Sequence, residues 1–562
     1  MRISAKSVSI VVLLAAAVWV QAVVTRMPGA PGYPGRTREA VPGAERLAAR
    51  WAAEYAERDL SAGTPIHLGF SRAFSKHFTK ASGTVLLDFD AGRVTVAVKD
   101  LGPLPENATY ELWLVEQTPG DTNTAALDLG PGGDRILSLG ALPPSGALAA
   151  TVGAEALAAM SVDMATVVRL SPGGAPEYVI GGMQSVRFQV GRGDQVQAPA
   201  FLVAGFGAPA APAQKGGGKK LAALIAEGRD LFFNGTFGGN GRTCGTCHRP
   251  DRDLTMDAEF IASLSSKDPL FVAELDANLP DFDPDRPTVP ALEDAGPGGL
   301  MRTRALTLEN ISGFEVDQAG LLLFPPVFRA TPSLFNLEFT APYGLSDCCP
   351  DLQTFAAGAV IQHFTRTLNR VPGVDFVLPT AAELQALEAF QLSNTSPADG
   401  NFKVSGRRSL LSTAGDPRAT DTARPEIRGR DLFLSVGCTS CHLGTVFSGG
   451  AANLDTGVEA LEGTIANRTP TVDVGDGQGR FQIPQLFGLR KQHFFHTGLL
   501  GNNTVVIPGE TPGFANLRQA VAFYVSAEFG GSPEGAFFPA LQVLTDTDLD
   551  DIAHFLERIS GG

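Results

Sequence analysis

Two copies of one five-residue motif constrain this chain more than any other feature of its sequence. Residues 244–248 are Cys-Gly-Thr-Cys-His, and residues 438–442 are Cys-Thr-Ser-Cys-His. This is the attachment pattern of c-type haem, in which two thiols three positions apart bond the vinyl groups of one porphyrin. The following histidine supplies the proximal ligand of the iron. We therefore predict two covalently bound haem c groups, around which the chain has to fold.

The motifs also name the residues that bind each haem. A zinc site is one alternative, but it needs four ligands and usually brings two Cys-x-x-Cys pairs that are close in sequence. Here the pairs are far apart, and each is followed by histidine. A thioredoxin-like dithiol is the other alternative, but it belongs to a βαβ unit and requires no histidine. The predicted haem-binding thiols are Cys244, Cys247, Cys438 and Cys441, and the predicted proximal iron ligands are His248 and His442.

The N-terminus has the pattern of a secretory signal peptide. A basic stretch at residues 1–6 precedes an apolar run at residues 8–24, and Val-Gln-Ala at 20–22 offers a cleavage site. We expect a signal peptide over residues 1–22 and a periplasmic or secreted protein, in a compartment where bacteria attach c-type haem. An uncleaved N-terminal anchor is the alternative, because the run is nearly long enough to span a bilayer. No later segment is that apolar, so we expect no integral membrane protein after cleavage.

Length and charge limit the remaining possibilities. A chain of 562 residues predicts about three or four domains. The net charge of −15 argues against nucleic acid as a partner. An acidic surface would steer a basic partner, such as a small redox protein that donates or accepts electrons. The alternative is that the acidity only aids solubility.

Composition divides the rest of the chain into domains. Residues 23–63 predict a linker and a short helix, the helix over 45–59. Residues 64–206 predict an all-β sandwich, because apolar and polar residues alternate between turn-forming Gly and Pro. An Ala-, Pro- and Gly-rich linker follows at 207–220. The predicted strands include residues 85–89, 93–98, 110–115 and 185–190.

The last two-thirds of the chain is an internal duplication, which predicts two mainly helical domains at residues 221–428 and 429–562. Each half has the same landmarks in the same order. The last landmark has a direct physical interpretation, because a capping Thr, an acid at the third helical position and apolar residues at three-residue steps predict an amphipathic helix. The paired landmarks are Gly-Arg-Asp-Leu-Phe at 228–232 and 429–433, Pro-x-Leu-Phe-x-Leu at 332–337 and 484–489, and the capped helix at 380–390 and 545–555.

From about residue 221 to 559 the arrangement resembles the bacterial di-haem cytochrome c peroxidases and MauG-like proteins. That family carries Pro-x-Leu-x-x-Val and then Pro-Tyr-x-His-x-Gly in its second half. This chain has Pro-Gln-Leu at 484–486 and Phe-Phe-His-Thr-Gly at 494–498, with Thr-Ala-Pro-Tyr at 340–343 in its first half. The resemblance implies two cytochrome c-like domains, one haem for electron transfer and one that reacts with hydrogen peroxide or a related oxidant. It also implies a calcium ion, which this sequence does not place.

The chain departs from the family pattern in three places. No histidine lies between His248 and His363, Phe355 stands where family peroxidases have a catalytic Gln, and no tryptophan lies between the haem motifs. The expected function is an exported di-haem oxidoreductase that resembles these peroxidases, with electron transfer between its haems. The alternative is a non-enzymatic electron-transfer cytochrome in which both irons are six-coordinate.

The distal ligand of the second haem follows partly by elimination. No Met follows Met301, so methionine from the same half is excluded. Tyr524 stands where the family places its distal ligand, which is Tyr in MauG-like proteins, so the resemblance implies Tyr524 as an iron ligand. A core tyrosine is the alternative. The full set of candidates is His493, His496, Tyr524 and His554.

The first haem has its own distal candidates. His363 aligns with Tyr524 in one register of the repeat, and in the other register the aligned residue is Ala359. These two positions are four residues apart and share a helix face. We therefore predict His363 as an iron ligand or as the catalytic distal group, with an interior histidine as the alternative. The other candidates are Met301, Met256 and an open site.

Two further cysteines, Cys348 and Cys349, are adjacent and lack the histidine of a haem motif. In an oxidising compartment they could form a strained vicinal disulfide, which is easily reduced. A rigid loop with no redox role and a free thiol pair are the alternatives.

Overall fold

The structure is a computed structural model of the whole chain. The predicted signal peptide, Cys348, His493 and His496 lie outside the residues that it describes. Among the described helices, none is long and apolar enough to cross a membrane. The described residues are 43–58, 63–75, 77–118, 129, 132–193, 217–272, 300–309, 327–344, 349–394, 421–443, 446–449, 453–458, 480–489, 494–495 and 514–560.

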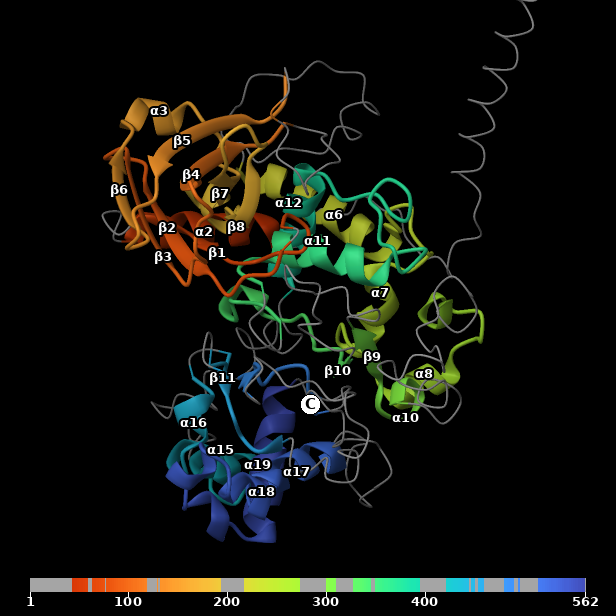
Figure 1. Cartoon of the computed structure of the whole chain (residues 1–562). Coiled ribbons are helices and arrows are strands. Elements are labelled where there is room, and N and C mark those ends of the chain that lie inside the picture. The colour runs from red at the N-terminus through yellow and green to blue at the C-terminus, as the bar shows by residue number, and fades with distance from the viewer. Residues whose placement is uncertain are drawn as a thin grey trace, which may run out of the picture.

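The N-terminal region contains two four-stranded antiparallel sheets (Figure 1). Their strand orders are β1-β2-β3-β6 and β5-β4-β7-β8. Alternate residues of both sheets point into one shared core, including Val85 and Val96 from the first sheet and Leu112 and Val167 from the second. The predicted all-β region is thus confirmed. The strands are β1 Thr64–Leu68, β2 Ser82–Asp88, β3 Arg93–Lys99, β4 Thr109–Glu116, β5 Arg135–Ala141, β6 Ala147–Thr151, β7 Met164–Leu170 and β8 Glu177–Met183.

One predicted strand in this region is wrong. Residues 185–190 alternate in polarity, yet they lie in helix α4, Val186–Arg192. The Ser185 side chain caps the helix by accepting a hydrogen bond from the backbone N–H of Arg187, and Gly193 ends it in the left-handed conformation. The cap and the terminating glycine decide the local structure, and both were visible in the sequence. A short helix α3, Ala154–Ala158, also lies in this region.

The second sheet is buried on both faces. In β4, Leu112 and Leu114 face the first sheet, whereas Trp113 and Val115 belong to a second core with several helices. Those helices are α2, Ala44–Glu57, and helices of the first haem-motif half, the predicted domain at 221–428 that carries the motif at 244–248. Helix α2 confirms the predicted helix at 45–59. The N-terminal region and that half therefore share one continuous apolar core, with the second sheet as its middle layer (Figure 1).

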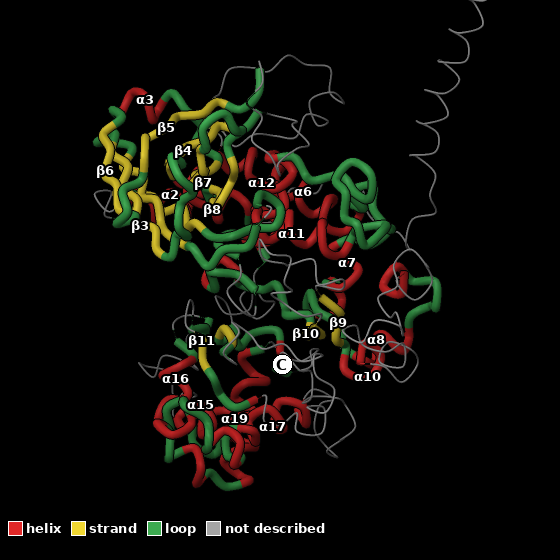
Figure 2. The backbone as a smooth tube through the Cα atoms, viewed as in Figure 1, coloured by secondary structure: helices red, strands yellow, loops and turns green. Residues whose placement is uncertain are grey.

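Each haem-motif half is mainly helical in its described residues (Figure 2). In the first half, α6 packs against α12, and in the second, α15 packs against α19. Helix α6 begins inside the predicted linker at 207–220, whose residues up to 216 lie outside the described part. The longer helices are α6 Gly217–Asn234, α11 Leu352–His363, α12 Ala381–Ser393, α15 Pro425–Ser435, α17 Phe514–Phe523 and α19 Asp546–Ile559. Shorter elements are α7 Cys244–Cys247, α8 Ala258–Ser263, α10 Leu300–Arg304, β9 Leu306–Glu309, β10 Val327–Ala330, α16 Cys438–Cys441, β11 Asn453–Leu454, β12 Phe481–Gln482 and α18 Ala527–Gly530.

The two helix pairs cross in the same way, which supports the duplication residue by residue. A Cβ atom at Gly228 of α6 would lie 1.8 Å from the carbonyl oxygen of Ala386, and one at Gly429 of α15 would lie 1.8 Å from that of Asp551. Only glycine allows such a close backbone approach. The predicted capping boxes at the starts of α12 and α19 are both present, between Thr380 and Glu383 and between Thr545 and Asp548.

Candidate haem sites in the two halves

The first Cys-x-x-Cys-His motif begins as a single helical turn, α7. The Thr243 side chain and backbone pair with Thr246 in a capping box, which fixes the turn that carries both thiols. Burial raises the pKa of the Cys244 thiol to about 12. Redox-active dithiols have a lowered thiol pKa, because the thiolate is the reactive form. The environment of Cys244 therefore suits a thiol held among apolar groups, and not an activated dithiol.

His248 is held by the backbone just beyond this turn. Its Nδ1 lies 2.8 Å from the carbonyl oxygen of Leu254, which accepts a hydrogen bond from the ring. That bond fixes the tautomer and leaves Nε2 available to a metal. Burial lowers the pKa of His248 to about 4, so the imidazole is in the neutral, ligating form. Leu254 has φ +57°, a conformation that a branched side chain rarely adopts and that places its carbonyl at the ring.

The second motif repeats this geometry. Nδ1 of His442 lies 3.0 Å from the carbonyl oxygen of Phe447, and Phe447 has φ +52°. Burial lowers the pKa of His442 and raises that of the Cys438 thiol to about 12. The thiol pair and the oriented histidine thus recur as one unit in both halves. Each predicted proximal ligand has a strained, bulky residue as its hydrogen-bond acceptor.

Equivalent neighbours surround the two imidazoles. The ring of Phe232 lies 6.0 Å from that of His248, and the ring of Phe433 lies 6.4 Å from that of His442. Both imidazoles are desolvated although the two residues are only half-buried. The sets fit a covalently attached porphyrin. In the described part of the chain, no three His, Cys, Asp or Glu side chains gather as ligands of a bare metal ion.

His363 lies at the C-terminal end of α11, beside the first motif. Burial lowers its pKa to about 3, and the charges of Arg242, Arg370 and His248 act in the same direction. Hydrogen bonds from Asn240 to the end of α11 tie His363 to the loop that leads into the first motif. The alternative ligands Met256 and Met301 are almost fully buried in an apolar cluster that contacts Cys247.

Tyr524 follows α17 in the second half. Its ring contacts Phe495, Phe523 and Phe529. Burial raises the pKa of Tyr524 far above its ordinary value, and the neighbouring Cys438 and Cys441 act in the same direction. Tyr524 and Cys438 pack against the same apolar cluster, so the structure brings Tyr524 to the second motif. His554 lies on α19.

Sequence reasoning missed one residue at the first site, Asn240. Its side-chain amide donates to the carbonyls of His363 and Thr365, both at 2.9 Å. Its backbone N–H donates to the carbonyl of Phe364 at 2.8 Å. Asn240 precedes Cys244 by four positions, so it ties the attachment loop to the end of α11. A single asparagine in a loop carries no sequence signal that would have indicated this role.

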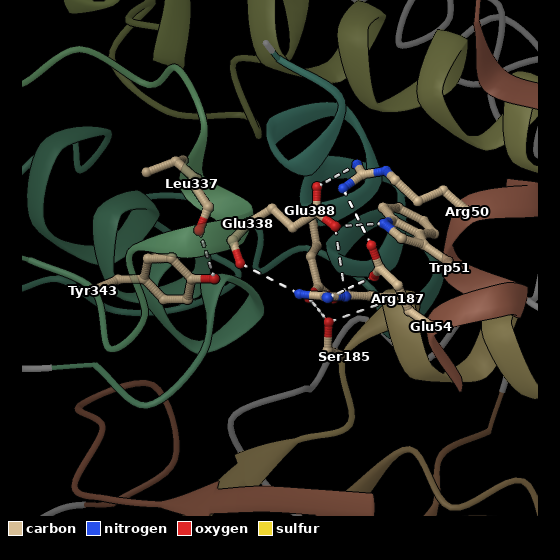
Figure 3. Close-up of polar contacts among 9 residues, drawn as sticks. All are labelled: Arg50, Trp51, Glu54, Ser185, Arg187, Leu337, Glu338, Tyr343 and Glu388. Atoms are coloured by element: carbon tan, nitrogen blue, oxygen red, sulfur yellow. Dashed lines mark hydrogen bonds and ion pairs between the residues drawn. The ribbon is translucent and has the colours of Figure 1, made fainter. Parts of the chain in front are cut away.

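A polar network lies between the β region and the first half, where it contacts the start of α11 and the middle of α12. Figure 3 shows the part of it that includes Trp51, Ser185, Glu338 and Glu388. The indole N–H of Trp51 donates to Glu338 at 2.7 Å, and the hydroxyl of Ser185 donates to Glu388 at 2.6 Å. Asp351, the N-cap of α11, accepts a hydrogen bond from the backbone N–H of Met183 at 2.9 Å. Burial raises the pKa of Glu388 to about 7 and that of Asp351 to about 6.

Comparisons with known proteins add little to these observations. No protein-family model and no curated protein matches the chain. One similar solved structure is that of hydrazine synthase from Kuenenia stuttgartiensis, pressurized with xenon. It is 17% identical, and the match covers 41% of this chain and 72% of that one, with a TM-score of 0.24. A TM-score this low does not establish a shared fold.

Proposed function

We propose that the chain is an exported di-haem c-type cytochrome that acts as an oxidoreductase, similar to the cytochrome c peroxidase and MauG-like group. One observation carries the proposal. In both halves a Cys-x-x-Cys turn leads into a histidine whose Nδ1 is held by a strained backbone carbonyl, which leaves Nε2 available. If the motifs had arisen by chance, we would not expect the same backbone carbonyl contact to the histidine ring in both halves. The two cytochrome c-like domains of the proposal rest on the same duplication.

Each half supplies a complete set of attachment groups. Cys244 and Cys247 would bond one porphyrin with His248 as its proximal ligand, and Cys438, Cys441 and His442 would do the same in the second half. Bound haem iron supplies one-electron redox chemistry, and its potential depends on the axial ligands and their hydrogen bonds. Burial keeps both histidines neutral, as metal ligation requires.

The distal residues decide which chemistry follows. Phe355 stands in place of a catalytic Gln, so His363 is the polar distal group that we assign to the first site. It would either close the site as a second ligand or move the proton of a bound peroxide. At the second site, burial opposes ionisation of Tyr524, and a ferric iron beside it would offset that cost by supplying a positive charge.

A second candidate function is a plain electron carrier that exchanges electrons with a small redox protein. The hydrogen bonds from Asn240 favour it, because they fix the backbone of His363 against the attachment loop. A histidine held in this way would close the first site in both redox states. The two functions differ in whether His363 always closes the distal position of the first haem or leaves it open to peroxide.

The haem content tests the proposal directly. Wild-type protein should retain haem through acid–acetone extraction and contain two haems per polypeptide by the haemochrome assay. Cys438→Ala combined with Cys441→Ala should remove one of them, whereas Cys349→Ala should remove none. One haem in the wild type, or zinc in place of iron, would contradict the proposal.

A further inference from the structure

The two halves of the duplication meet through equivalent segments, residues 332–337 in the first half and 484–489 in the second. In the first half, the hydroxyl of Ser333 donates to the carbonyl of Asp253 at 2.8 Å, next to Leu254, whose carbonyl holds the ring of His248. In the second, the backbone N–H of Leu486 donates to the carbonyl of Val446 at 3.2 Å, next to Phe447, whose carbonyl holds the ring of His442. Each segment therefore lies beside the residue that orients the predicted proximal histidine of its own half. The segment that follows β10 runs between the two halves (Figure 1).

The two segments have the same backbone shape. Asn336 has φ +58° and the equivalent Gly488 has φ +71°. Asparagine and glycine are the residue types that tolerate this left-handed conformation best. The same turn thus presents each segment to the other half.

The contact between the segments is close and buried. The side-chain amide of Asn336 donates to Oε1 of Gln485 at 3.3 Å, and both residues are buried. A Cβ atom at Gly488 would lie 2.8 Å from the Phe335 ring and 3.1 Å from the hydroxyl of Ser333, so the Gly488 backbone lies directly against these two side chains. Gln485 is held in turn, because its Nε2 donates to the carbonyl of Phe487 at 2.9 Å and its Oε1 accepts from the Phe487 N–H.

We propose that this contact is the electron route between the two haems, by way of Ser333, Asn336, Gln485 and Leu486. The inference rests on the proposed function. With haem bound at both motifs, one electron would pass from a ferrous to a ferric iron, so no atom or proton would have to cross between the halves. Stretches of covalent chain and five hydrogen bonds, with the one between Asn336 and Gln485 at the middle, would then join the two proximal histidines.

The sequence leaves this route without a tryptophan relay. The three tryptophans are at positions 19, 51 and 113, all before the first haem motif. Charge transfer between the halves therefore depends on how tightly the two proximal segments pack. The buried hydrogen bond between Asn336 and Gln485 and the side-chain-free surface of Gly488 keep that packing tight.

Asn336→Gly tests the route with little disturbance of the backbone, because glycine is the residue that the second half uses at the same position. Gln485→Met is the second variant, since it keeps the side-chain length and loses the amide. Gln482→Ala is the matched control, because Gln482 makes a separate hydrogen bond between the halves, from its Nε2 to the carbonyl of Thr340 at 2.9 Å. Unfolding in urea should show that all three variants fold.

The measurement is the rate at which an electron equilibrates between the two haems after one is reduced by a flash. The rate should fall several-fold in Asn336→Gly and in Gln485→Met, with unchanged haem content and midpoint potentials, and stay at the wild-type value in Gln482→Ala. Wild-type rates in both route variants, with two haems present, would overturn the route but leave the proposed function standing. A wild type with fewer than two haems would overturn both.

Discussion

The side-chain amide of Asn240 donates a hydrogen bond to the carbonyl of His363 at 2.9 Å. The last carbonyls of a helix have no partner within the helix, and here one loop asparagine satisfies that of His363, together with the carbonyl of Thr365 just beyond the helix. That loop leads directly into Cys244. The loop before Cys244 and His363, the proposed distal group, are therefore parts of one hydrogen-bonded unit.

Asn240→Asp should loosen His363. The substitution keeps the shape of the side chain but replaces two donors by a carboxylate oxygen that faces carbonyl oxygens. Loss of these bonds should lower the free energy of unfolding by about 1–3 kcal/mol, the usual cost of an unsatisfied buried group. In the haem-loaded protein the high-spin fraction of the first haem should rise.

Arg366→Ala is the control for that variant. Arg366 joins the same two segments through its exposed Nε, which donates to the carbonyl of Gly239 at 3.3 Å, but it does not touch His363. Its ferric spectrum should equal that of the wild type. If Asn240→Asp also keeps the wild-type spectrum, Asn240 has no part in positioning the histidine.

His363→Ala should turn the first haem high-spin and let it bind cyanide or carbon monoxide readily, because its predicted distal group is gone. Electronic absorption and ligand titration would measure this. We expect wild type to react with peroxide slowly, or only after partial reduction. Fast peroxide turnover that His363→Ala leaves unchanged would contradict the assignment, and no peroxide reaction in any redox state would favour the electron carrier.

Tyr524→Phe should change the ferric spectrum of the second haem and raise its reduction potential, because an anionic oxygen donor that stabilises ferric iron would be lost. Potentiometric titration followed by absorption would report both. Phe523→Leu, at the adjacent position, is a control for lost aromatic packing alone. An unchanged spectrum in Tyr524→Phe would direct attention to His496.

The packing of the β region against the first half should contribute less to the free energy of unfolding as pH rises. Burial raises the pKa of Glu388 from its ordinary value of 4.5 to about 7, so the folded state favours the protonated acid. The free energy of unfolding should therefore fall between about pH 4.5 and pH 7, and a shift of this size corresponds to roughly 3 kcal/mol for this one group.

Glu388→Gln isolates that contribution, because Gln mimics the protonated acid. Asp351 and Asp163, which lie between the same two regions, also have raised pKa values and remain in the variant. Urea unfolding at several pH values should show a shallower decline in Glu388→Gln than in the wild type. Parallel curves for the two proteins would show that Glu388 is ionised in the folded state.

The predictions from sequence succeeded where a pattern is local or repeated. Alternation gave β2, β3 and β4, and the spacing of Thr, acid and apolar residues gave the capped helices α12 and α19. The prediction from alternation failed at α4, where the capping Ser185 and the terminating Gly193 outweigh the alternating pattern. Polarity of successive residues is a weak guide for a segment so short.

The supporting residues of the haem sites could not be predicted for a different reason. Leu254 and Phe447 act through a backbone carbonyl, and their side-chain types carry no information about it. Asn240 and His363 are brought together from distant parts of the chain by the packing of α11. Such partners depend on tertiary geometry, so only the motif residues themselves were visible in the sequence.

The second sheet, buried on both faces, has a consequence for how this protein could be cut or shortened. Removing residues before 217 would leave the first haem-motif half with a bare apolar flank, where Leu221 of α6 and Leu384 of α12 now lie in the core shared with the sheet. It would also strip Asp351 and Glu388 of donors that satisfy them. The β region thus completes the core of the first half, and a protease or a deletion that removed it would destabilise the helices around the first Cys-x-x-Cys-His motif.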